Sequence, residues 1–156
     1  MLSKTVIIVC LAIAMGILAS GHSHAQSKSV VLITADEAQR PDPASADLTF
    51  RAGVSRGPGV ELVSPKPSEK SVHSPVHLQL KFEGRGGAQI DVDSLKLTYI
   101  KNPAADLTAR VKNFAKSDGI DIPEAQMPPG THTIRADIKD KEGRSGFLIF
   151  KLNVMN

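Results

Sequence analysis

The sequence predicts an all-β domain of antiparallel strands over residues 59–156. Two observations lead to this expectation. Apolar and polar residues alternate along several short segments, which is the pattern of strands that bury one face. Clusters of Gly, Pro and Asp separate these segments, and such residues favour turns. The expected unit is one domain, because the chain has 156 residues in all.

The predicted strands follow one another from Val60 onward. Pro65 and Pro67 interrupt the first strand and place it at a sheet edge, because proline cannot donate a hydrogen bond to a ladder. The second strand has the clearest alternation of apolar and polar side chains. The predicted strands are Val60–Pro65, Val76–Phe82, Leu95–Ile100, Thr131–Lys139 and Phe147–Val154.

Three segments between these strands are less regular. Residues 90–94 are expected to form a polar corner. Residues 107–114 have apolar positions spaced like one face of a helix but could also extend, and we expect a strand with an irregular end. Ile120 and Ile122 are expected to form a short extended piece that ends at Pro123.

The first 25 residues resemble a secretion signal in composition. Lys4 gives a positive start, Val6–Ala19 is apolar, and Ser23-His24-Ala25 is a small-x-small cleavage pattern. An uncleaved anchor is the alternative, but residues 5–19 as a helix would rise only about 22 Å against a bilayer core of about 30 Å. We therefore expect cleavage after Ala25 and a periplasmic or secreted protein with no membrane span in the mature chain.

Cysteine content and charge further restrict the expected compartment and the expected classes of partner. The only cysteine, Cys10, would leave with the signal, so the mature domain would have no disulfide, which favours the periplasm over the open medium. The signal holds one of the 19 Lys and Arg residues and none of the 16 Asp and Glu residues. The near-balanced charge that remains gives no long-range attraction for nucleic acid or anionic lipid.

Residues 26–58 form an N-terminal arm and linker in this interpretation. Thr34 and Glu37 match a capping box that could start one helical turn. From Pro41 to Gly59 the sequence mixes Pro, Asp, Ala, Ser and Gly, which is typical of an extended linker.

Three groups of residues resemble immunoglobulin-like modules of bacterial secreted proteins. They are the opening Val60–Pro65, the step Ser74–Leu78, and the closing Pro129–Asp137 followed by Asp140-Lys141-Glu142-Gly143. The likeness covers about residues 59–155 and implies an immunoglobulin-like antiparallel β-sandwich in which Gly143 takes the left-handed position of the last turn. Arg144 stands where that family often has Asn. The chain lacks the cysteine pair and core Trp of antibody-type domains.

No catalytic motif accompanies this fold, so we expect a non-enzymatic protein without a cofactor that binds a protein partner. The last strand is apolar on both faces, because Phe147 and Ile149 point away from the side that holds Leu148 and Phe150. Phe147 and Ile149 are therefore the candidate partner contacts. Either Val30–Ile33 folds back over them, or another protein covers them.

A copper carrier is the alternative function. His73 and His77 are the candidate metal ligands, because periplasmic copper carriers that resemble this fold bind copper through histidines. Cleavage after Gly21 instead of Ala25 would also keep His22 and His24 at the mature N-terminus, where an amino group and imidazoles chelate copper.

Overall fold

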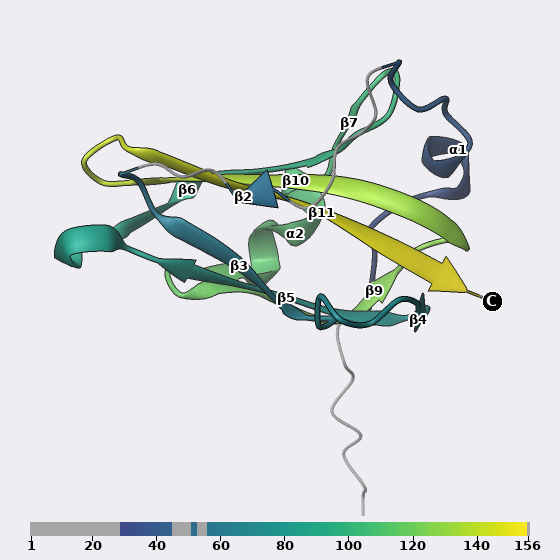
Figure 1. The fold of residues 1–156 in the computed structure, drawn as a ribbon, viewed down its shortest axis with the longest axis horizontal. Coiled ribbons are helices and arrows are strands. Elements are labelled where there is room, and N and C mark those ends of the chain that lie inside the picture. The colour runs from purple at the N-terminus through teal and green to yellow at the C-terminus, as the bar shows by residue number, and fades with distance from the viewer. Residues whose placement is uncertain (1–28, 45–50, 53–55, 156) are drawn as a thin grey trace, which may run out of the picture.

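The computed structural model describes residues 29–44, 51–52 and 56–155, and it consists of two β-sheets packed together as two layers (Figure 1). The predicted all-β sandwich is confirmed. The proposed signal, residues 1–25, lies outside the described residues, and so do His22 and His24.

The first sheet has the strand order β1-β9-β5-β3, and β8 also pairs with β9. The pairs β3–β5, β5–β9 and β8–β9 are antiparallel, whereas β1 runs parallel to β9. The strands are β1 (Ser29–Val31), β3 (Gly59–Ser64), β5 (Val76–Glu83), β8 (Ala115–Lys116) and β9 (Gly119–Gln126).

The second sheet has the strand order β2-β11-β10-β6-β7, and β4 pairs with the end of β11. The two longest strands, β10 and β11, pair antiparallel from Gly130 opposite Val154 to Lys139 opposite Ser145. The strands are β2 (Arg51–Ala52), β4 (Val72–His73), β6 (Ile90–Tyr99), β7 (Ala105–Asp106), β10 (Gly130–Asp140) and β11 (Ser145–Met155). The helical turns are α1 (Ala35–Ala38), η1 (Arg85–Gly87), α2 (Thr108–Val111) and η2 (Lys112–Phe114).

The core lies between the sheets and is built from alternate side chains of both. Each fully buried aliphatic side chain contributes about 1.5–3 kcal/mol relative to exposure. The most deeply buried members, each at most 1% exposed, include Leu78, Leu80, Leu97, Tyr99, Ile120, Ile122, Ile134, Ala136, Ile138, Leu148 and Phe150. The alternation in the sequence therefore gives the buried face of each main strand.

A close backbone crossing joins the two layers at one side. A Cβ on Gly146 would meet the carbonyl oxygen of Pro58, and a Cβ on Gly57 would meet that of Ser145. The chain thus enters β3 by passing directly over the start of β11, and side chains at these two glycines would separate the strands.

Three sequence expectations differ from the structure. Within residues 107–114, Leu107 precedes α2 and residues 108–114 form α2 and η2 instead of a strand, because the Asp106 carboxylate accepts the backbone N–H of Thr108 at 2.8 Å and Val111 is buried in the core. Residues 90–94 belong to the continuous strand β6. β9 runs on past Pro123, an exposed residue, and from Glu124 pairs with β1.

The N-terminal arm does not fold over Phe147 and Ile149, so that explanation for the doubly apolar strand is wrong. Residues 29–31 add a strand to β9 in the first sheet, whereas Phe147 and Ile149 lie on β11 in the second sheet. Leu32 and Ile33, which follow β1, are 0% and 1% exposed and belong to the main core. The arm is therefore part of the same packed unit.

Candidate functional site

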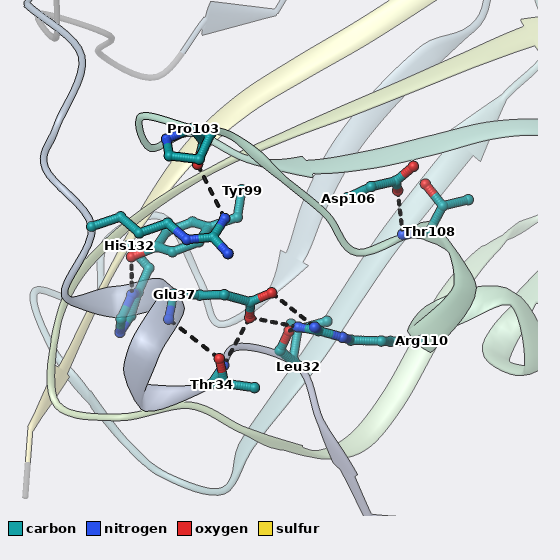
Figure 2. A network of polar contacts seen from close by, with 10 residues as sticks. Leu32, Thr34, Glu37, Tyr99, Pro103, Asp106, Thr108, Arg110 and His132 are labelled. Atoms are coloured by element: carbon teal, nitrogen blue, oxygen red, sulfur yellow. Dashed lines mark hydrogen bonds and ion pairs between the residues drawn. The ribbon is translucent and has the colours of Figure 1, made fainter.

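A polar network ties the arm to α2 (Figure 2). The Arg110 guanidinium donates two hydrogen bonds to the Glu37 carboxylate, of 2.7 and 2.8 Å, and a third of 2.8 Å to the carbonyl of Leu32. The side chains of Glu37 and Arg110 are 10% and 30% exposed. A bidentate pair of this geometry fixes the orientation of the Arg110 guanidinium relative to the Glu37 carboxylate, and each group neutralises the charge of the other.

The predicted capping box at the start of α1 is confirmed and orients Glu37. Thr34 Oγ1 accepts the backbone N–H of Glu37 at 3.3 Å, and Glu37 Oε2 accepts the backbone N–H of Thr34 at 3.0 Å. The hydrogen bonds from Arg110 are the largest cause that lowers the pKa of Glu37, to about 2. Glu37 is therefore ionised at neutral pH although it is nearly buried.

A second buried pair lies on the strands β6 and β10. His132 Nε2 is 2.8 Å from the carbonyl oxygen of Pro128, which can only accept, so Nε2 carries the proton. His132 Nδ1 then accepts from the Tyr99 hydroxyl at 3.0 Å. Burial lowers the pKa of His132, and burial together with the Asp42 charge raises the pKa of Tyr99 to about 12. Both rings are neutral at pH 7.

Three contacts hold the end of the arm to the loop that follows β6. Lys101 Nζ pairs with the Asp42 carboxylate at 2.7 Å, and the Lys101 side chain is only 9% exposed. The backbone N–H of Asn102 donates to the Pro41 carbonyl at 2.9 Å. Arg40 donates to the Pro103 carbonyl at 3.1 Å. The arm thus starts on the first sheet and ends on the second.

Sequence reasoning identified one half of this network and missed the other. The Thr34-x-x-Glu37 spacing revealed the helix start, but the partner of Glu37 is Arg110, 73 residues later. Nothing in the spacing of charges singles out Arg110. No pattern in the sequence singles out His132 either, since its partner Tyr99 comes from another strand.

The predicted partner contacts, Phe147 and Ile149, differ in accessibility. Ile149 is 5% exposed and lies outside the main core cluster, whereas Phe147 is partly buried. The Arg135 guanidinium lies 4.6 Å from the centroid of the Phe147 ring. Asp137 accepts hydrogen bonds of 2.7 to 3.0 Å from Arg135, whose side chain is 41% exposed. The Phe147 ring on β11 and the Arg135 side chain on β10, which Asp137 holds in place, therefore lie side by side.

The two candidate metal ligands are on different sheets. His73 lies on β4, which pairs with β11 of the second sheet, and His77 lies on β5 of the first sheet. His77 Nε2 is 2.8 Å from the carboxylate of Asp121 on β9. Within the described residues no three His, Cys, Asp or Glu side chains gather as a metal-binding group. The copper-carrier alternative stays a prediction.

Comparisons of this chain with protein-family models, with curated proteins and with solved structures found no match. Among the described residues, no helix has the length and apolar character needed to cross a membrane.

Proposed function

We propose that this chain is a non-enzymatic periplasmic binding or scaffolding protein, an immunoglobulin-like sandwich that presents a sheet face to a protein partner. The partner would contact the outer face of β10 and β11 around Phe147. We define the Phe147 patch as Phe147, Arg135 and Asp137.

The strand order supports the immunoglobulin-like part of the proposal. β3, β5 and β9 are neighbours in one sheet, and β6, β10 and β11 in the other. In chain order these correspond to strands A, B and E and strands C, F and G of an immunoglobulin constant-type domain. β1 takes the position beside E that strand D has there. A fold of this kind hosts many functions, so the function rests on the patch.

The Phe147 patch is the observation that carries the function. Arg and aromatic residues are enriched where protein interfaces gain most of their affinity. Asp137 and the Phe147 ring already fix the Arg135 side chain, so less rotamer entropy is lost when a partner binds. The patch therefore has the chemistry and the order of an interface centre.

Substitution of Phe147 tests the proposal in cells. We expect Phe147→Ser to reduce partner recovery at least tenfold after crosslinking in the periplasm and affinity purification, since loss of a central aromatic anchor costs about 2 kcal/mol or more. Lys81→Ala, an exposed change on the first sheet, is the matched control. Equal recovery with Phe147→Ser and the unaltered chain, at equal stability, would contradict the proposal.

The proposed compartment is tested by mass spectrometry of the chain recovered from a periplasmic fraction. We expect an N-terminus at Gln26. A chain that begins at His22 would support the copper-carrier alternative, and an uncleaved chain in the cytoplasmic fraction would overturn the proposed location.

A further inference from the structure

The surface that receives the arm behaves as a built binding site for an extended segment. We define the arm as residues 29–42, and the arm groove as the β9 edge at Glu124–Gln126, Arg110 and the loop 101–103. β1 pairs in parallel with β9 from Ser29 opposite Glu124 to Val31 opposite Gln126. The Gln126 carbonyl then accepts the N–H groups of Leu32 and Ile33, at 2.9 and 3.4 Å.

The arm groove recognises both backbone and side chains. Main-chain pairing to a sheet edge is a general mode of peptide binding, and side-chain contacts add selectivity. Here two consecutive aliphatic residues, Leu32 and Ile33, are buried, and Glu37 meets Arg110. The contacts of the arm groove therefore match an aliphatic pair followed by a carboxylate at a fixed distance along the segment.

An empty arm groove would leave buried and partly buried polar groups without their hydrogen-bond and ion-pair partners. Without the arm, Arg110 would lose all three of its acceptors described above, and the nearly buried Lys101 would lose Asp42. The β9 edge at Gln126 would lose its backbone partners. An occupant with the sequence of the arm restores each of these contacts.

None of these contacts depends on the arm belonging to the same chain. The paired residues are 59 to 78 positions apart for Arg110 and the loop. Pro41 and Pro43 stand at the end of the arm, and Pro58 precedes β3. Proline restricts the backbone and favours extended conformations. An extended connection is compatible with an arm that reaches a second copy as well as with one that returns to its own domain.

We propose that the arm groove also binds the arm of a second copy of this chain, so that two copies exchange arms reciprocally. Glu37 of each copy then pairs with Arg110 of the other, and the contacts of the single chain are reproduced twice around a two-fold axis. Exchange of an identical element needs no new interface to evolve. This dimer is independent of the Phe147 patch.

Concentration decides between the two forms. Exchange keeps every arm contact but joins two molecules, which costs translational and rotational freedom. The dimer fraction is therefore expected to rise with protein concentration, most clearly when the copies are unfolded and refolded together.

Two single-cysteine variants test the exchange. Val31 and Gln126 are paired opposite each other and both are exposed, so a cysteine at either position leaves the core intact. Copies with Val31→Cys and copies with Gln126→Cys, both carrying Cys10→Ser, are refolded together and oxidised. We expect disulfide-linked heterodimers, up to about half of all exchanged dimers because random pairing makes half of them mixed.

A matched pair controls for chance collisions. Lys151→Cys is exposed on β11 of the other sheet and replaces Gln126→Cys in the control mixture. A chain that carries both Val31→Cys and Gln126→Cys forms an intramolecular disulfide when its arm lies in its own arm groove, so this disulfide reports the single-chain form. No excess of heterodimer over the control at near-millimolar concentration, with closure within the double-cysteine chain, would overturn the proposal.

Charge reversal gives a second, independent measurement. Glu37→Arg places two cations together within one copy, and Arg110→Glu places two anions together. In a mixed dimer with exchanged arms both ion pairs are opposite in charge. We expect native mass spectrometry of the mixture to show a 1:1 heterodimer that neither variant forms as a homodimer. Two stably folded variants that remain monomeric when refolded together would contradict the proposal.

Discussion

At the scale of single residues, Arg110 carries most of the polar attachment of the arm. It donates to three acceptors that lie 73 and 78 positions earlier in the chain. These hydrogen bonds lower the pKa of Glu37 from 4.5 to about 2, so the folded chain takes up this proton less readily than the unfolded chain. Acid should therefore weaken the attachment.

We predict that Glu37→Gln lowers the free energy of unfolding by about 2–3 kcal/mol at pH 7. The stabilisation from Glu37 is fully present above pH 5 and is lost as pH falls from about 4.5 towards 2, because the protonated carboxyl no longer pairs with Arg110. The difference between the two proteins should shrink over this range. Urea unfolding at several pH values measures it.

Asp36→Asn is the control, because it changes an exposed carboxylate in the same helical turn. A pH-independent difference between the unaltered chain and Glu37→Gln would show that the ion pair contributes nothing to stability.

At the scale of elements, the sequence predicted those whose causes are local. Alternation gave the strands from Val60 to Val154, and the left-handed φ of +80° at Gly143 agrees with the expected turn. The helix α2 was missed because Val111, its buried residue, packs into a core built from distant strands. Periodicity alone does not report such contacts.

The crossing of residues 57–58 over β11 leads to a second prediction at this scale. Gly146→Ala should destabilise the fold by about 1–3 kcal/mol, because a methyl group would push the Pro58 backbone away. Thermal and urea unfolding measure the change.

Gly59→Ala, two residues beyond Gly57, provides the comparison. A Cβ there would lie 3.6 Å from the Cβ of Glu83, an ordinary contact, so we expect a change within about 0.5 kcal/mol. Equal effects of the two substitutions would argue against a tight crossing.

At the scale of the whole molecule, the arm spans the two sheets at one side of the sandwich. It pairs with β9 of the first sheet and contacts the loop after β6 of the second. The composition of residues 41–59 indicated a linker, but nothing in the sequence indicated that Leu32 and Ile33 of the arm belong to the core. The burial of Leu32 and Ile33 depends on a surface that forms only when strands distant in sequence have packed together. Local composition does not report such long-range contacts.

We predict that Leu32→Ala lowers the free energy of unfolding by about 2–5 kcal/mol, since Leu32 is 0% exposed within the core. Val31→Ala is the control, because Val31 is 49% exposed and should change stability by about 0.5 kcal/mol or less. A small effect of Leu32→Ala in urea unfolding would mean that the arm detaches without loosening the sandwich.

The pairing of β11 has a consequence for the order of folding. β11 follows β2, β4 and β10 along the sequence, and it is the partner of all three. Until it emerges, β10 has an exposed edge and the crossing at Gly146 has no second strand. The nascent chain therefore cannot complete this sheet until Ser145–Met155 has been synthesised, so the three earlier strands wait for a partner that is distant in sequence from β2 and β4.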